Sequence, residues 1–163
     1  MNENGLNYID LFAGAGGLSE GFIQSGYRPI AHVEMNEHAA KTIETRIAYY
    51  YLKDNGKIKS YYDYEKGKIT REQLLDKIPK EELKTVINEE MSEATIKGIF
   101  NTIDDIKREK EIDKIDVIIG GPPCQAYSLV GRAQSSHMIV PMEDDPRNEL
   151  YKMYVQFLKK YKP

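Results

Sequence analysis

The feature that most constrains the fold is an apolar run that ends in a rigid corner, residues 116–128, with the sequence DVIIGGPPCQAYS. An apolar run closed by glycines and prolines predicts a buried parallel strand, and open α/β folds bind their ligands at the carboxyl ends of such strands. The corner presents Cys124, the one cysteine of the chain, on a backbone that Pro122 and Pro123 restrict. We therefore expect a thiol at a ligand-binding edge. The alternative is a small buried hydrophobic residue, as most single cysteines are.

A second strand is predicted at residues 8–12, followed by the glycine-rich turn 13–17 and by a segment with helical spacing, 18–22. This order begins many nucleotide-binding α/β folds, because glycines let the backbone approach a ligand and the helix offers free N–H groups. The turn departs from the G-x-G-x-x-G pattern, since Ser19 stands where the third glycine would be. A nicotinamide-dependent oxidoreductase could share such a turn.

The next strand is expected at residues 26–34, and it ends in Glu34. An acidic side chain about 20 residues past a glycine turn is placed to accept hydrogen bonds from ribose hydroxyls. For a single glutamate, a solvated carboxylate before the following helix is the alternative. That helix is expected from Asn36, a good N-cap residue, to about Tyr50.

The amino-acid composition changes in the middle of the chain. From about 46 to 98, tyrosines alternate with lysines and acidic residues, which favours an inserted, partly helical segment packed by its own tyrosines. Contact of this segment with nucleic acid is the alternative. A third, weaker strand is predicted at residues 99–106, a polar loop at 129–142, and an amphipathic helix at 151–158.

Three stretches resemble, in the same order, motifs of the cytosine-5 DNA methyltransferase family: DLFAGAGGLSEGF, the PPCQ corner, and DPRNELY at residues 145–151. The resemblance implies an α/β, Rossmann-like S-adenosylmethionine-dependent methyltransferase fold, incomplete, with a mostly parallel sheet flanked by helices. It also implies transfer of a methyl group from S-adenosylmethionine to carbon 5 of cytosine in DNA, through a covalent adduct with Cys124. A cytosine-5 methyltransferase that acts on RNA is the alternative, and a degenerate module that only binds a partner is disfavoured because the motif residues are intact.

The same resemblance assigns roles to residues. Cys124 is the expected catalytic residue. An aspartate at the end of the third strand reaches the adenine in the family, and Asp105 is chosen over Asp104 because Ile106 follows it. The residues expected to bind the cofactor are Phe12, Ala13, Gly14, Gly16, Gly17, Leu18, Glu34, Met35, Asp105, Ile106, Gly121, Pro123 and Leu150. Those expected to contact the substrate are Gln125, Ser128, Arg132 and Arg147.

Several expected parts of such an enzyme are missing from these 163 residues. The family's Glu-Asn-Val and Arg-x-Arg motifs and its target-recognition domain are absent. We therefore expect residues 1–163 to be the amino-terminal part of a catalytic domain, a fragment or one subunit that is inactive alone. The expected partners are double-stranded DNA and a second chain or a missing carboxyl-terminal half, in a restriction-modification setting.

Composition sets further limits. A chain of this length predicts one domain, and one cysteine with three dispersed histidines predicts neither a disulfide nor a metal site. No apolar run approaches the roughly 20 residues that cross a bilayer, and the first residues lack the features of a signal peptide, so we expect a cytoplasmic protein without membrane contact. The net charge of −3 is unusual for an enzyme that acts on nucleic acid, because contacts with phosphates normally come from basic side chains. We therefore expect most of the DNA-binding residues to lie in sequence outside these 163 residues.

Overall fold

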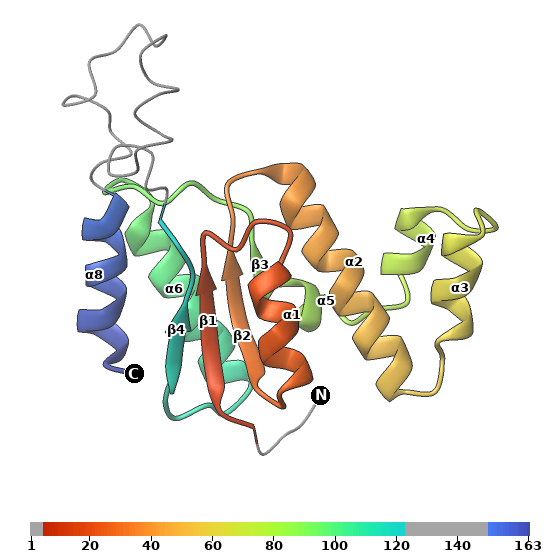
Figure 1. The fold of residues 1–163 in the computed structure, drawn as a ribbon, viewed down its shortest axis with the longest axis horizontal. Helices are drawn as coiled ribbons and strands as arrows, with labels where there is room; N and C mark the ends of the chain where they lie inside the picture. Colours follow the sequence, from red (N-terminus) through yellow and green to blue (C-terminus); the bar gives the residue numbers. More distant parts are fainter. Residues whose placement is uncertain (1–4, 123–149) are drawn as a thin grey trace, which may run out of the picture.

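The computed structural model describes residues 5–122 and 150–163. Its centre is a four-stranded sheet in which every neighbouring pair is parallel and the strand order is β3-β2-β1-β4 (Figure 1). Parallel neighbours need crossover connections, and helices provide them here. The strands are β1 (Asn7–Leu11), β2 (Arg28–Val33), β3 (Val86–Ile87) and β4 (Val117–Ile119).

Helices flank this sheet on both faces, so the expected α/β class with a parallel sheet is confirmed. The helices are α1 (Gly17–Gln24), α2 (Glu37–Asp54), α3 (Lys59–Glu65), α4 (Arg71–Leu75), α5 (Lys80–Leu83), α6 (Ile96–Glu109) and α8 (Leu150–Tyr161). One expected helix boundary is confirmed. Asn36 caps α2 by accepting a hydrogen bond from the Ala39 N–H at 3.0 Å. At the end of α1, Gly26 has a positive φ of 87°.

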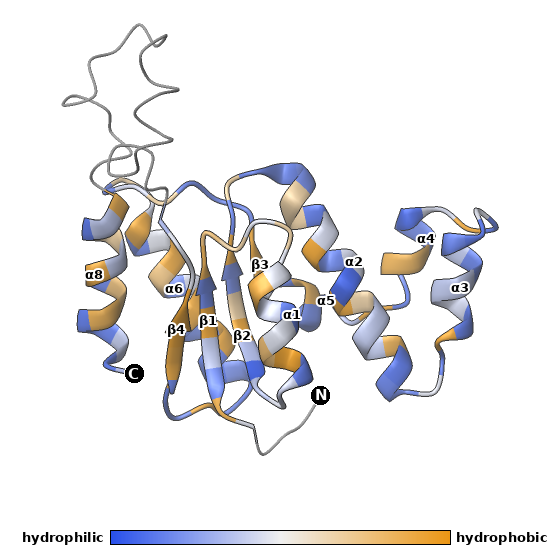
Figure 2. Ribbon diagram, viewed as in Figure 1, coloured by the Kyte–Doolittle hydropathy of each residue, from blue (hydrophilic) through white to orange (hydrophobic). Residues whose placement is uncertain are grey.

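The two faces of β1 pack differently because successive side chains of a strand point to opposite sides. Ile9 and Leu11 join a buried cluster with residues of α6 and α8, including Ile103 and Phe157. Tyr8 points the other way, toward α1, where its ring centroid lies 5.4 Å from that of Phe22. Figure 2 shows β4 as apolar along its length.

The predicted third strand is wrong. Residues 99–106 lie within α6, and its isoleucines at 96, 99, 103 and 106 are all buried. Their spacing of three and four residues is helical, which outweighs the strand preference of single β-branched residues. The true third strand is Val86–Ile87, and a strand of two residues carries no readable alternation.

The segment between α2 and β3 is helical and has a core of its own. Ala48 and Leu52 of α2 are buried with Leu74 and Ile78, and tyrosines including Tyr51, Tyr61 and Tyr64 pack around them. This agrees with the expectation of a segment packed by its own tyrosines. In Figure 1, α3 and α4 project beyond α2, away from the sheet. That the segment is an insertion relative to the family stays a prediction, as do its limits of 46 and 98.

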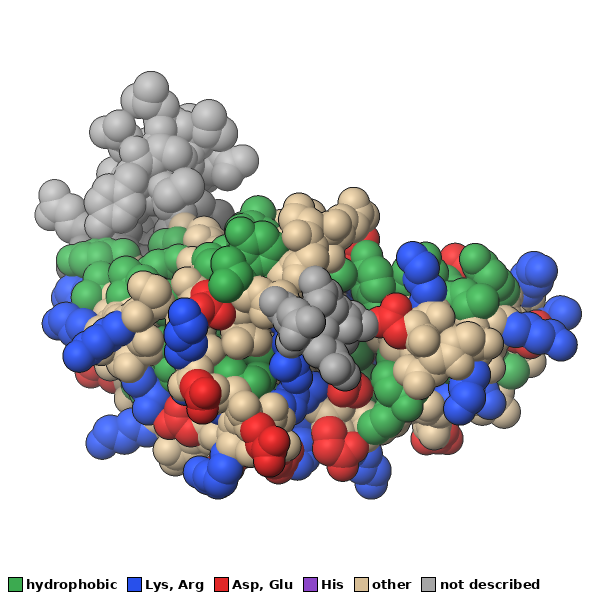
Figure 3. All heavy atoms as spheres, turned by 90° about the horizontal axis from the view of Figure 1, so that it is seen from below, with side chains coloured by type: hydrophobic (Ala, Val, Ile, Leu, Met, Phe, Trp, Pro, Cys, Tyr) green, Lys and Arg blue, Asp and Glu red, His purple; other side chains and the backbone are tan. Residues whose placement is uncertain are grey.

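Charges of both signs share the surface at the amino ends of the strands. Figure 3 shows this face, where lysine and arginine side chains alternate with acidic ones over the described residues. Within residues 5–122 and 150–163, no helix is long and apolar enough to cross a membrane. The same ranges hold no group of three or more histidine, cysteine or acidic side chains that could bind a metal ion.

Candidate cofactor site

Several of the predicted cofactor residues lie at one edge of the sheet, those of the glycine-rich turn and Glu34 among them. Because β1, β2 and β4 are parallel, their carboxyl ends meet there, and the chain leaves them through the turn 12–17, through Glu34 and through residues 120–122. The Ala13 N–H donates to the Val33 carbonyl at 3.1 Å, which extends the pairing of β1 with β2 beyond the strands. The turn and Glu34 are therefore neighbours.

The glycine-rich turn has a backbone that favours glycine. Gly14 and Gly16 have φ values of 56° and 78°, in the left-handed region. A Cβ added to Gly14 or Gly17 would meet nothing within 4 Å, so the turn faces open space there. Gly16 is the N-cap of α1 and provides no side chain to cap it, so the first N–H groups of the helix can receive an anion.

Glu34 ties this turn to the strand beside it. Its Oε2 accepts the Gly14 N–H at 2.7 Å, and its Oε1 accepts the Asn36 N–H at 2.7 Å. Two apolar side chains stand exposed nearby, Met35 with 67% and Leu18 with 54% of their surface accessible. A carboxylate beside exposed apolar side chains is a suitable lining for a nucleoside, which has a polar sugar and a flat apolar base.

One residue at this edge was missed from the sequence. Asn88 directly follows β3, and its Nδ2 donates to the carbonyls of Glu34 at 2.8 Å and of Met35 at 3.1 Å. It therefore fixes the backbone that carries both predicted nucleoside contacts. The signal was the change from the apolar pair Val86–Ile87 to the polar residues 88–90, and an apolar pair is too short to recognise as a strand without the fold.

Asp105 and Ile106 do not reach this edge. They lie in the last turns of α6, which follows β3 and returns the chain toward the amino ends of the strands (Figure 1). Asp105 is exposed and pairs with Arg108 at 2.9 Å, whereas Ile106 is buried in the core. Their selection depended on a strand that does not exist, so the proposed adenine contact is corrected.

Asp10 lies near the end of β1 and is buried, with 1% of its surface exposed. Its Oδ2 has no hydrogen-bond partner. Burial, and secondarily the charge of Glu34, raise the pKa of Asp10 to about 7. The sequence places Asp10 before the turn without assigning it a function.

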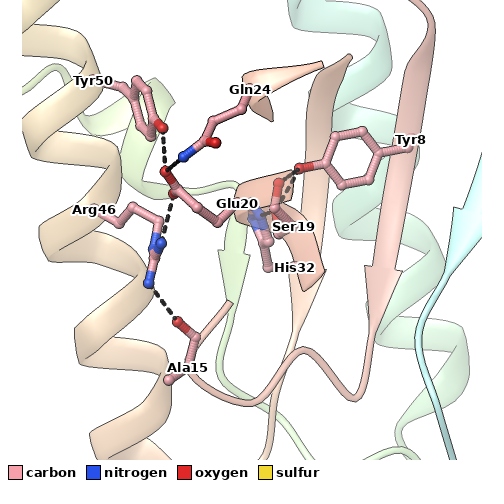
Figure 4. A network of polar contacts seen from close by, with 8 residues as sticks. All are labelled: Tyr8, Ala15, Ser19, Glu20, Gln24, His32, Arg46 and Tyr50. Atoms are coloured by element: carbon pink, nitrogen blue, oxygen red, sulfur yellow. Dashed lines mark hydrogen bonds and ion pairs between the residues drawn. The ribbon is translucent and has the colours of Figure 1, made fainter. Parts of the chain in front are cut away.

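A buried polar network joins α1 to the sheet (Figure 4). Ser19 Oγ lies 2.8 Å from His32 Nε2, and it also shares a hydrogen bond with the hydroxyl of Tyr8. Ser19, at the position of the third glycine of a dinucleotide fingerprint, thus has a structural use. Burial, assisted by the nearby Arg46, lowers the pKa of His32 to about 4, so its ring is neutral at pH 7.

The opposite pKa shifts of Asp10 and His32 predict compensating effects of pH on stability. The raised pKa of Asp10 favours folding below pH 4, and this contribution is lost as the pH rises to about 7. The lowered pKa of His32 favours folding above pH 6.5, and this contribution is lost as the pH falls to about 4. Each contribution is at most roughly 3 to 4 kcal/mol.

Relative to the unmodified chain, Asp10→Asn should therefore make the free energy of unfolding rise more steeply between pH 4.5 and 6.5. His32→Gln should make it fall over the same interval. Urea unfolding at several pH values measures both slopes. Parallel pH profiles for the two variants and the unmodified chain would contradict the buried states assigned to these groups.

The end of β4 shows an unusually close approach of two strands. Gly120 has a φ of 125°, and a Cβ at this position would lie 1.8 Å from the Leu11 carbonyl oxygen. Gly121, a predicted cofactor residue, is exposed at the same edge, and Leu150, another one, lies at the start of the described part of α8. The predicted residues Pro123, Cys124, Gln125, Ser128, Arg132 and Arg147 lie outside the described residues.

Comparison with known proteins adds the family. A family model described as C-5 cytosine-specific DNA methylase matches residues 6–82 and 77–163. The chain belongs to this family. The methylase resemblance drawn from the glycine-rich turn and the PPCQ corner is thereby confirmed, whereas the remaining residue assignments stay predictions.

Relatives of this methylase chain are type II methyltransferases. It is 35% identical to M.Bpa9945I of Bacillus paralicheniformis over 95% of its own length, 30% identical to M1.HphI of Haemophilus parahaemolyticus over 97%, and 34% identical to the putative M.MjaORF1200P of Methanocaldococcus jannaschii over 90%. It spans only 38%, 30% and 41% of the length of these three proteins. No solved structure gives a significant match.

Proposed function

We propose that the chain is the cofactor-binding and nucleophile-bearing part of a DNA (cytosine-5) methyltransferase. The observation that carries this proposal is the hydrogen bond of Glu34 to the Gly14 amide, at the edge where β4 leads into the PPCQ corner. In this proposal, the ribose acceptor Glu34, the anion-binding turn and the strand that precedes Cys124 in the chain belong to one site. The family membership supports the same conclusion.

The residues at this edge suit S-adenosylmethionine. Each Glu34 oxygen accepts one backbone N–H and keeps acceptor capacity for a ribose hydroxyl. The exposed side chain of Met35 can cover the adenine, and the free N–H groups at the start of α1 can receive the cofactor's carboxylate. When bound, the cofactor supplies an electrophilic methyl group.

The proposed chemistry uses Cys124 as a nucleophile. Carbon 5 of cytosine is poorly nucleophilic, and addition of the thiolate to carbon 6 makes it enamine-like and able to accept the methyl group. Loss of the carbon 5 proton then expels the thiol. In the sequence, Cys124 follows Pro122, the last described residue before it, by two positions.

The base must leave the duplex to reach this thiol, at a cost of a few kcal/mol. We assign contacts with the extruded base or its phosphates to Gln125, Ser128, Arg132 and Arg147, as the resemblance implies. Protonation of the cytosine ring and recognition of the target sequence are assigned to the part of the enzyme that the relatives have and this chain does not.

A second polypeptide, or a carboxyl-terminal continuation, is therefore part of the proposal. Exposed apolar side chains on the described surface support it: Tyr151, Val155 and Leu158 recur at helical spacing on α8. Among the described residues, β4 pairs with β1 alone. Such surfaces are suited to burial by further protein.

The function is tested by completing the chain with the part of M.Bpa9945I that it does not cover, fused or co-expressed. With S-adenosylmethionine labelled in its methyl group, label is expected at carbon 5 of cytosine in duplex DNA, and the 163-residue chain alone is expected to be inactive. Transfer to an RNA transcript of the same sequence, in place of DNA, would favour the RNA alternative. Calorimetry with NAD in place of S-adenosylhomocysteine tests the oxidoreductase alternative.

Glu34→Gln is expected to weaken binding of S-adenosylhomocysteine by roughly 10-fold to 100-fold, because hydrogen bonds to a charged group contribute about 1.5 to 3 kcal/mol. A glutamine also cannot accept both the Gly14 and the Asn36 N–H groups, since one end of its amide is a donor. Calorimetric titration measures the affinity. Glu37→Gln is the control, because Glu37 is exposed and forms an ion pair with Lys41 on the surface of α2. Equal losses in both variants would contradict the role of Glu34.

A further inference from the structure

Arg46, in the middle of α2, joins two parts of the glycine-rich turn region. Its Nη1 lies 2.5 Å from Glu20 Oε2 on α1, and its Nη2 donates to the Ala15 carbonyl in the turn at 3.3 Å. Figure 4 shows the guanidinium between these two groups. One cation therefore connects the turn with the first turn of the helix that follows it.

Glu20 is well suited to hold this cation. It also accepts hydrogen bonds from the Tyr50 hydroxyl at 2.5 Å and from Gln24 Nε2 at 2.8 Å. Although burial acts in the opposite direction, the hydrogen bonds from Tyr50, Arg46 and Gln24 lower the pKa of Glu20. The carboxylate is thus ionised at neutral pH, and α2 reaches α1 through two side chains, Arg46 and Tyr50.

The same part of α2 also packs against the turn through apolar atoms. Ile43 and Ile47 form a buried cluster with Ala13. A Cβ on Gly16 would lie 3.4 Å from Ile43 Cγ1 and 3.7 Å from Arg46 Nε. The turn is therefore backed by α2 at Gly16, while it faces open space at Gly14.

We propose that Arg46 is a positioning residue for the cofactor: by holding the Ala15 carbonyl and the Glu20 carboxylate together, it fixes the direction of the free N–H groups at the start of α1. The proposal rests on the proposed function, in which these N–H groups receive the carboxylate of S-adenosylmethionine. Arg46 acts through the turn. Without it, the turn must be ordered during binding, and that ordering reduces affinity.

Arg71 provides a matched control within the same protein. It pairs with the Glu44 carboxylate and donates to the Lys41 carbonyl at 3.2 Å, so it also bridges a carboxylate and a backbone carbonyl. Its bridge joins α4 to α2, away from the turn. Both arginines line an open pocket of about 830 Å³ between α2, α3 and α4, so shortening either side chain leaves space that water can enter.

The test compares Arg46→Gln with Arg71→Gln in the 163-residue chain, by calorimetric titration with S-adenosylhomocysteine and by thermal unfolding. Arg46→Gln is expected to weaken binding about 10-fold and Arg71→Gln less than about twofold, at similar losses of thermal stability. Arg46→Lys should fall between Arg46→Gln and the unmodified chain, because a lysine lacks the planar fork that joins two acceptors. It replaces Arg46→Gln if that variant does not fold. Unchanged affinity in the Arg46 variants, or equal losses at Arg46 and Arg71, would overturn the proposal.

Hydrogen exchange separates this proposal from the cofactor assignment, because it needs no ligand. The backbone N–H groups of residues 15–18 should exchange faster in Arg46→Gln, while those of β1 and β2 keep their protection. Exchange at the unmodified rate in the turn would overturn the positioning role even if the cofactor binds. An unmodified chain that binds no S-adenosylhomocysteine would instead overturn the cofactor assignment at this turn.

Discussion

Gly120→Ala is expected to prevent the chain from folding, or to destabilise it by more than about 4 kcal/mol. The new Cβ would lie 1.8 Å from the Leu11 carbonyl oxygen, and a φ of 125° is a conformation that side chains rarely adopt. Relief requires β4 to move away from β1, which breaks the parallel pairing of these two strands. Circular dichroism with thermal and urea unfolding measures the loss.

Gly121→Ala is the control for this result. A Cβ on Gly121 would meet nothing within 4 Å, so its effect on the free energy of unfolding should stay within about 0.5 kcal/mol. A cooperative unfolding transition of Gly120→Ala at the unmodified temperature would contradict the close approach of the two strands.

Cys124→Ser is expected to reduce methyl transfer by the completed enzyme on the order of 10⁴-fold or more, the usual scale for loss of a nucleophile. A serine hydroxyl is far less ionised than a thiol near neutral pH, so addition to carbon 6 of cytosine should fail. The methyl-transfer assay with labelled cofactor measures the rate. A covalent complex with DNA, detected by electrophoresis under denaturing conditions, should form with the unmodified enzyme and not with Cys124→Ser.

Binding of S-adenosylhomocysteine controls for damage to the fold. Because serine is nearly the size of cysteine, the affinity of Cys124→Ser should stay within about twofold of the unmodified enzyme. Retained methyl transfer in Cys124→Ser would contradict the covalent mechanism. If Cys124→Ser also lost cofactor binding, this would contradict the proposal that Cys124 serves as the nucleophile while the glycine-rich turn binds the cofactor.

Local signals allowed the fold to be predicted as far as the start of α2. The strand, glycine turn and helix around residues 8–22, and the Asn36 cap of the following helix, are specified by residues close together in the chain. Gly14 and Glu34, to which the resemblance assigns cofactor binding, are joined by a hydrogen bond. Motifs made of neighbouring residues can be read directly from sequence because tertiary packing changes them little.

Contacts between distant residues could not be predicted in this way. The isoleucines of α6 resemble a strand until their burial on one helical face is known, and this error led to the choice of Asp105. Arg46 lies 31 residues from Ala15, and no local sequence pattern predicts the hydrogen bond between them. Similarly, the sequence shows Gly120 beside a proline corner, but only the pairing with β1 reveals why a side chain is excluded there.

The projecting helices have a hydrophobic cluster that is distinct from the one beneath the sheet. A destabilising substitution in α3 or α4 should therefore disturb that small cluster first. Two connections lead from it to the glycine-rich turn: Leu83, which also packs against the cluster that contains Ala13, and α2, whose Arg46 binds Glu20. The order of the turn thus depends on how firmly the middle of α2 is held.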